Sequence, residues 1–322
     1  GTSGTVQLIN SCILPNEIIV SGSLQISVSS SRRRFLKQKL KSAQLLVQAA
    51  ANSRHFSVPA ASTLTLNGFT LSDGNPGDAG GSILASGGSV TVTGVTFKNN
   101  KGTTGGAIEA EKDQANNDPA VTIKTSTFDN NEGTGGGGAI NVKAGVFNVD
   151  GSVFTNNKAP NGDGGAVAAV TDVTIITSTF EANSAPSGSG GAVAVDGKQL
   201  TMTDVTLKSN SAQNGGAVNL KAGTATLSLL DVESNTATAE GGAILVDDSD
   251  VTISSSNIKE NDGATGGGIK TKNMGGKQFS STSNTFNGNS GSSGGGAFHF
   301  DDDANANIKI FVGPKVMIKT PV

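Results

Sequence analysis

The sequence has no tryptophan and no tyrosine, a single cysteine (Cys12), two histidines (His55 and His299) and only 8 prolines in 322 residues. Without Trp or Tyr, it lacks the side chains that most often stack on sugar rings or nucleobases. One cysteine excludes an internal disulfide framework and a cysteine-rich zinc site, and two distant histidines argue against a histidine metal site. We therefore expect no metal, no cofactor, and a fold that is stabilised by its core.

Long apolar segments and a continuous basic face are also missing. No run of about 18 apolar residues occurs, so the sequence predicts no transmembrane span. The formal net charge is -3, and acidic residues are in excess beyond residue 60, so we expect no nucleic-acid partner. The chain begins at Gly1 with neither a methionine nor a signal peptide, which we interpret as a mature or excised segment.

Glycine, by contrast, is abundant and periodic, with 45 copies. Nine Gly-Gly pairs, each followed by a small residue and an apolar one, recur at spacings of 25 to 32 residues. A period in the twenties is typical of stacked solenoid coils rather than of helical repeats, which need about 33 residues or more. The pairs begin at Gly80, Gly105, Gly137, Gly164, Gly190, Gly215, Gly241, Gly266 and Gly295.

Each repeat also holds an alternating segment that ends in an apolar residue, with an asparagine three positions later. The segment from Val90 to Phe97, followed by Asn100, is one example. Alternation of β-branched residues indicates a half-buried strand, and equivalent strands of successive coils must lie side by side about 4.8 Å apart. We predict an all-β fold, a right-handed single-stranded parallel β-helix of the pectin-lyase-like type, with about ten coils of about 25 residues.

Stacking the repeats predicts three inward columns of apolar side chains. Each such residue contributes roughly 1.5 to 3 kcal/mol when fully buried, so the columns supply much of the core. The first column is Leu66, Val92, Ile123, Val149, Ile175, Met202, Leu227 and Ile253; the second is Ile83, Ile108, Ile140, Val167, Val193, Val218, Ile244, Ile269 and Phe298; the third contains Phe97, Phe128, Phe154, Phe180 and Phe286.

The glycine pairs and the asparagines are interpreted as structural. The paired glycines permit a positive φ or a close approach of two coils where the chain turns into the next strand. The asparagines form a ladder of side-chain amides that satisfies turn backbone groups, since Asn tolerates the left-handed conformation and bonds locally. A ligand-binding row is the alternative for the latter set, which is Asn100, Asn131, Asn157, Asn183, Asn210, Asn235, Asn261 and Asn289.

These tandem Gly-Gly-Ala-aliphatic and Phe-x-x-Asn motifs resemble the repeats of the chlamydial polymorphic outer membrane proteins, and of β-helical surface proteins more widely. The resemblance covers residues 68–298, roughly 70% of the chain. It implies an exposed, adhesive or scaffold-like passenger, extracellular or at a cell surface. Its motifs specify the coil and carry no catalytic residues.

The two ends depart from the regular pattern. Residues 1–60 are expected to form an N-terminal cap and the first coils, with a basic insertion over residues 31–55. Residues 43–51 are rich in helix formers, so this insertion is predicted to be a short helix or a loop. Residues 61–322 are expected to form the regular β-helix, which can continue beyond the C-terminus. A solvated insertion is the simpler interpretation of 31–55; otherwise it, or the last coil, binds a protein partner or a surface polysaccharide.

A search for catalytic groups gives few candidates. Polysaccharide lyases of this fold are expected to use a basic residue, often arginine, on the solenoid face, yet all four arginines lie before residue 55. General acid and base work requires a pair of carboxylates, for which the candidates are Asp247, Asp248, Asp301 and Asp302. Both clusters follow a strand, where a solvated turn explains them more simply.

One outward column is rich in threonine. It contains Thr91, Thr122, Thr174, Thr201, Thr226 and Thr252, and regular threonine columns resemble ice-binding faces. Charged Lys124 and Asp150 in the adjacent column interrupt a flat array, and Thr has a high β propensity in any case. The leading hypothesis is therefore a non-enzymatic structural or adhesive solenoid; the alternatives are a polysaccharide-modifying enzyme of lyase or epimerase type and an ice-binding protein.

Overall fold

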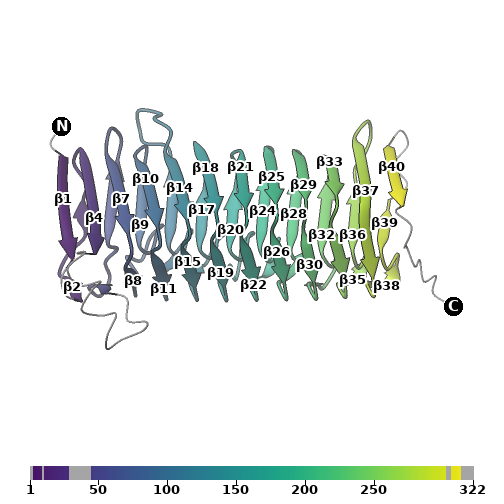
Figure 1. Ribbon diagram of the computed structural model, residues 1–322, viewed down its shortest axis with the longest axis horizontal. Coiled ribbons are helices and arrows are strands. Elements are labelled where there is room, and N and C mark those ends of the chain that lie inside the picture. The colour runs from purple at the N-terminus through teal and green to yellow at the C-terminus, as the bar shows by residue number, and fades with distance from the viewer. Residues whose placement is uncertain (1–2, 9–10, 29–44, 302–305, 313–322) are drawn as a thin grey trace.

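Each coil of the chain contains short strands that are separated by tight turns, and the coils stack into a rod (Figure 1). The computed structural model describes residues 3–8, 11–28, 45–301 and 306–312. Every strand pair between coils is parallel, in three long sheets and a short fourth one. This architecture confirms the prediction of an all-β parallel β-helix of about ten coils.

Sheets A and B follow each other along every coil. They join in β37, whose residues pair with strands of both sheets. Sheet A comprises β1 (Ser3–Leu8), β4 (Ser23–Val28), β7 (Thr63–Asn67), β10 (Ser89–Thr93), β14 (Ala120–Lys124), β18 (Val146–Asp150), β21 (Val173–Ile176), β25 (Gln199–Thr203), β29 (Thr224–Ser228), β33 (Asp250–Ser254), β37 (Gln278–Asn287) and β40 (Asn307–Val312). Sheet B comprises β2 (Cys12–Leu14), β5 (Leu46–Ala49), β8 (Thr70–Ser72), β11 (Thr96–Lys98), β15 (Thr127–Asp129), β19 (Val153–Thr155), β22 (Thr179–Glu181), β26 (Thr206–Lys208), β30 (Asp231–Glu233) and β34 (Asn257–Lys259).

Sheets D and C complete the coil before the chain returns to sheet A. Sheet D comprises β12 (Lys101–Gly102), β16 (Glu132–Gly133), β23 (Ser184–Ser189), β27 (Ser211–Asn214), β31 (Thr236–Ala237), β35 (Asp262–Thr265) and β38 (Ser290–Gly294). Sheet C comprises β3 (Ile18–Ile19), β6 (Phe56–Pro59), β9 (Ile83–Ser86), β13 (Ile108–Glu111), β17 (Ile140–Val142), β20 (Val167–Ala169), β24 (Val193–Asp196), β28 (Val218–Lys221), β32 (Ile244–Asp247), β36 (Ile269–Lys272) and β39 (Phe298–Phe300).

The core consists of the apolar columns that the repeat predicts. In β10, Val90 and Val92 are buried while the residues between and beside them are partly exposed, which is the expected alternation. Phe97, Phe128 and Phe154 stack with ring centroids 4.7 Å apart and interplanar angles of 6° and 3°. Phe180 continues this stack at 4.6 Å. The near-parallel rings follow from the coil register, which places identical side chains directly above one another.

The Gly-Gly pair forms the sharpest corner of the coil. Its first glycine has a positive φ, as at Gly137 (57°), and its second lies against the next coil. A Cβ on Gly138 would lie 1.9 Å from the backbone oxygen of Gly165, and the corresponding contacts at Gly106 and Gly216 are 2.1 Å. Both roles expected from the sequence are therefore present, one on each glycine.

Part of the predicted N-terminal insertion belongs to a strand. Residues 29–44 lie outside the described residues, but Leu46–Ala49 form strand β5, which pairs with β2 and β8. The expectation of a helix or loop over this part of 31–55 was wrong. Val47 and Ala49 are buried in the core, so pairing and burial outweigh the helix propensity of the segment.

His55 closes the N-terminal end of the column of small residues that follow the glycine pairs. Its ring is fully buried, with Nε2 3.1 Å from the Val47 carbonyl oxygen and Nδ1 3.0 Å from the Ser82 hydroxyl. This geometry fits a neutral imidazole that donates from Nε2 and accepts at Nδ1. Burial lowers the pKa of His55 from 6.5 to about 4.

Acid is therefore expected to destabilise these coils. The neutral imidazole stabilises the fold fully above pH 6.5, and the contribution is lost as the pH falls from 6.5 towards 4, by about 3 kcal/mol in total. Hydrogen exchange of β5, β6 and β9 across this window measures the loss. In the His55→Gln variant the pH slope should become shallower; an unchanged slope would show that other groups cause it.

Candidate functional site: a polar groove along sheet C

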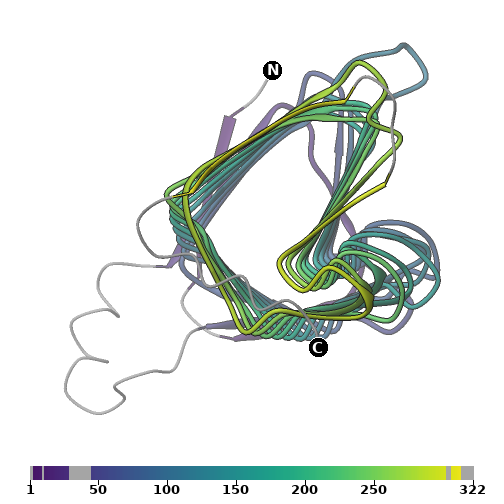
Figure 2. The same ribbon diagram turned by 90° about the vertical axis from the view of Figure 1, so that its right-hand side faces the viewer.

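A groove runs along the rod beside sheet C. The view along the rod shows stacked coils that turn inward beside an outward loop (Figure 2). A Gly-Gly pair whose first glycine has a positive φ lies shortly before the sheet C strand in each coil from β9 onward. The groove has a volume of about 320 Å³ and extends from β17 to β36. Outward side chains of sheet C form one wall, and Asp163, Ser189 and Asn214 lie on the opposite wall.

The inner column of the groove lies next to the glycine corner. Ala168 and Ala194 leave the middle of the groove open, whereas larger side chains fill the same position in the other coils. The column reads Leu84, Glu109, Asn141, Ala168, Ala194, Asn219, Leu245, Lys270 and His299 along the rod.

The outer column of the groove alternates in charge. It reads Glu111, Lys143, Val170, Asp196, Lys221, Asp247 and Lys272, with three acids and three lysines. Neighbours pair between coils: Lys143 with Glu111 at 3.4 Å, Lys221 with Asp196 at 3.6 Å, and Lys272 with Asp247 at 3.8 Å. This wall therefore has no net charge along its length.

Glu109 lies in β13, one coil before the N-terminal end of the groove. Its carboxylate is fully buried, accepts from the Asn141 carboxamide at 3.0 and 3.1 Å, and lies 2.8 Å from Lys143 Nζ. Burial raises the pKa of Glu109 above its ordinary value, an effect that Lys143 opposes. Burial lowers the pKa of Lys143, but pairing with Glu109 and Glu111 outweighs it, so the net shift is upward.

The structure brings two of the predicted acids, Asp247 and Asp301, into one charged cluster at the C-terminal end of the groove. Asp301 pairs with the buried Lys270 and lies 3.4 Å from His299 Nε2. Asp247 pairs with Lys272, whose Nζ also lies 2.6 Å from Glu240. Burial lowers the pKa of Lys272, but the hydrogen bond and charge of Glu240 outweigh it, so the pKa is raised overall.

The other two predicted acids are not in this cluster. Asp248 faces away, in a turn with a φ of 47°, and pairs with Lys277 at 3.3 Å. Asp302 lies outside the described residues. Within the part of the chain that the structure describes, no group of three or more His, Cys, Asp or Glu side chains is placed to hold a metal ion.

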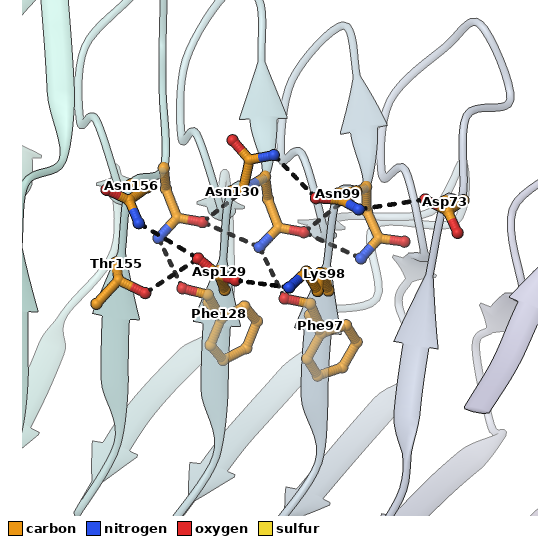
Figure 3. Close-up of polar contacts among 12 residues, drawn as sticks. Asp73, Phe97, Lys98, Asn99, Phe128, Asp129, Asn130, Thr155 and Asn156 are labelled. Atoms are coloured by element: carbon orange, nitrogen blue, oxygen red, sulfur yellow. Dashed lines mark hydrogen bonds and ion pairs between the residues drawn. The ribbon is translucent and has the colours of Figure 1, made fainter. Parts of the chain in front are cut away.

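The predicted asparagines lie in one row at the corner after sheet B, and all of them except Asn289 are buried. Asn157, for example, donates from Nδ2 to Asn183 Oδ1 and to the Phe128 carbonyl, both at 2.9 Å, and accepts from Asn131. The positive φ belongs to the residue before each asparagine, such as Asn156 (55°), so the reason given from the sequence was misplaced by one position. On the exposed side, Asn130 donates to Asn99 Oδ1 at 2.8 Å, whereas Asn156 donates to Asp129 Oδ1 at 3.4 Å (Figure 3).

The predicted threonines lie on the outer face of sheet A. Thr91 and Thr122 are direct partners, as are Thr174 and Thr201, and Thr226 and Thr252. Asn148 separates the first pair from the others. The column is thus in register along the rod and far from the groove in the coil.

Apart from Asp247, the groove residues were missed by the sequence analysis. Each inner-column residue directly follows the second apolar column, so its position in the repeat was known. The available signal was the presence of polar and charged residues in a column that otherwise contains Ala and Leu; they are Glu109, Asn141, Asn219, Lys270 and His299. What the sequence did not reveal was the inward corner that turns this outward face into a groove.

Comparison with known proteins supports the repeat. The family model of the Chlamydia polymorphic membrane protein repeat matches residues 125–143 and 151–170. No curated protein matches the chain. In the described residues, no helix is long and apolar enough to cross a membrane.

Two solved structures are similar to the chain over most of its length. One is the Azotobacter vinelandii mannuronan C-5 epimerase AlgE6 A-module, with 12% identity, a TM-score of 0.39, and coverage of 97% of this chain and 92% of that one. The other is the catalytic domain of a GH87 alpha-1,3-glucanase, with 13% identity, a TM-score of 0.36, and coverage of 98% and 63% respectively. The protein is a parallel β-helix whose repeats resemble those of chlamydial polymorphic membrane proteins.

Proposed function

We propose that this protein is a non-enzymatic adhesive or structural solenoid exposed at a cell surface. The observation that carries the proposal is that the ionisable groups along sheet C pair between neighbouring coils. Each acid of the outer column forms an ion pair with a lysine of the next coil. Glu109 accepts a hydrogen bond from Asn141 and forms an ion pair with Lys143. These pairs fix the register of neighbouring coils and leave no free carboxylate pair in the wall. The match to a membrane-protein repeat supports the surface location.

Incubation with a panel of neutral and uronic-acid polysaccharides, with and without calcium, tests the non-enzymatic character. We expect no shortened chains, no unsaturated products and no change in uronic-acid configuration. Any of these products would overturn the proposal. Limited proteolysis of intact source cells tests the location: the coils should be accessible to the protease without lysis, and full protection would contradict surface exposure.

A polysaccharide-modifying enzyme is the second candidate, and one observation favours it. Lys270, His299 and Asp301 place an amine, an imidazole and a carboxylate together beyond the groove end. If the panel gives a product, we expect the His299→Ala variant to lose most of the rate, because general acid or base catalysis contributes about 10²- to 10⁴-fold. A product whose rate is unchanged in this variant would remove the cluster from consideration.

A further inference from the structure

We infer that the groove along sheet C binds an extended, uncharged polysaccharide, with the Asn219 carboxamide at its centre. This goes beyond the proposed function by naming a site and a ligand class for the adhesive role. Three observations carry it: an unpartnered polar side chain, the balance of charge, and the shape of the groove.

Asn219 presents a polar side chain to the groove. Its residue exposure is 9%, and it lines the groove from β28. Among the described residues, its carboxamide has no hydrogen-bond partner, in contrast to the buried asparagines of the ladder. An amide with no protein partner can donate to and accept from a ligand hydroxyl in place of water.

The charge of the groove selects against ionic polymers. Acids and lysines alternate along the outer column, so neither a polyanion nor a polycation meets a continuous field of opposite sign. The opposite wall adds Asp163, whose Oδ1 already accepts from the Ser189 backbone at 2.7 Å. The groove presents carboxamide, carboxylate and ammonium groups. A hydroxyl group can hydrogen-bond to any of them, because it both donates and accepts.

In the groove, β20, β24 and β28 can bind a ligand through their side chains but not through their backbone groups. The backbone N–H and C=O groups of β20, β24 and β28 are used between coils, in parallel pairing. A polypeptide that lay along the rod would run across these strands and would leave most of its own amides without backbone partners. A hydroxyl-rich chain has no such requirement, and its units can follow the coil rise of about 4.8 Å.

The shape places the ligand over β20 and β24. Ala168 and Ala194 form the hollow, and Asn219 flanks it on one side. The same column contains Leu84 and Leu245 in other coils, so the fold accepts a leucine at this position. Ala168→Leu should therefore fill the hollow without disturbing the coil.

Calorimetric titration with cellohexaose, maltohexaose and laminarihexaose tests the inference, with hexagalacturonate and an extended polyproline peptide as charged and peptide comparisons. At least one neutral hexasaccharide should bind. Affinity should fall about tenfold or more in both Asn219→Ala and Ala168→Leu, and should stay unchanged in Thr201→Ala on the outer face of sheet A. Far-UV circular dichroism verifies that each variant is folded.

Three outcomes would overturn the inference: no neutral hexasaccharide binds at millimolar concentration, binding is equal in all variants, or only hexagalacturonate or the peptide binds. The proposed function fails separately. A bound glycan that is cleaved or epimerised rejects the non-enzymatic solenoid but keeps the groove. If the protein is exposed at the surface, has no enzymatic activity and binds no glycan, the proposed function stands and the glycan site in the groove is rejected.

Discussion

The Gly138→Ala variant is expected to lose more than about 4 kcal/mol of stability and to unfold in two transitions instead of one. The added Cβ would lie 1.9 Å from the Gly165 oxygen and 2.6 Å from the Lys158 nitrogen, and both atoms belong to backbone that cannot rotate away. Since each coil contacts only its neighbours, separating two of them divides the rod into segments that unfold independently. Urea unfolding must be followed by far-UV circular dichroism, because the chain has no Trp or Tyr to report by fluorescence.

Gly275→Ala is the matched control. A Cβ at this position would have nothing within 4 Å, and its φ is not in the left-handed region. Its stability should change by no more than about 0.5 kcal/mol. A single, wild-type-like transition for Gly138→Ala would show that the coils can separate at this corner without loss, contrary to the packing described.

The Asn157→Asp variant is expected to lose about 3 to 5 kcal/mol at neutral pH, although it changes hardly any volume. The new carboxylate can still accept from Asn131, but its second oxygen faces two acceptors, Asn183 Oδ1 and the Phe128 carbonyl. Burial and these acceptors raise the pKa of the introduced carboxyl above its unfolded value of about 3.9. The deficit relative to wild type should therefore shrink as the pH falls through the folded pKa.

Chemical unfolding of variant and wild type at matched pH values isolates this effect from the titration of His55 and the native carboxylates. Asn156→Gly provides the control, because Asn156 is exposed and has a positive φ that glycine adopts without strain. The free energy of unfolding of this control variant should equal or exceed that of the wild type. A deficit for Asn157→Asp that stays constant with pH would argue against an unsatisfied buried carboxyl as its cause.

The sequence predicted the core because its signal is local and repeated. Ile108, Ile140 and Val167 occupy one position of the repeat, and parallel stacking allows only one way to align them. The same reasoning located the glycine corner. It failed at Leu46–Ala49, where residues with a good helix propensity are held in a strand by pairing with β2 and β8. Propensity acts within a segment, whereas this pairing spans residues that are far apart in sequence.

The groove was not predictable for a different reason. The repeat shows that Ala168, Ala194 and Asn219 are equivalent, and alternation shows that they point outward. Whether an outward face is convex or concave depends on the angle of the Gly-Gly corner and on the loop opposite it, neither of which the repeat determines. Asp163 and Ser189, on that opposite wall, belong to segments with no alternation at all.

The buried asparagine row also gives the rod an electrical direction. Every rung from Asn100 to Asn261 donates its amide to the next asparagine towards the C-terminus and accepts from the previous side, so the amide dipoles point the same way. Aligned amides polarise one another, as the peptide groups of a helix do, and each bond strengthens its neighbours. Substitutions in adjacent rungs should therefore be non-additive, since the first already removes the polarisation on which the second bond depends.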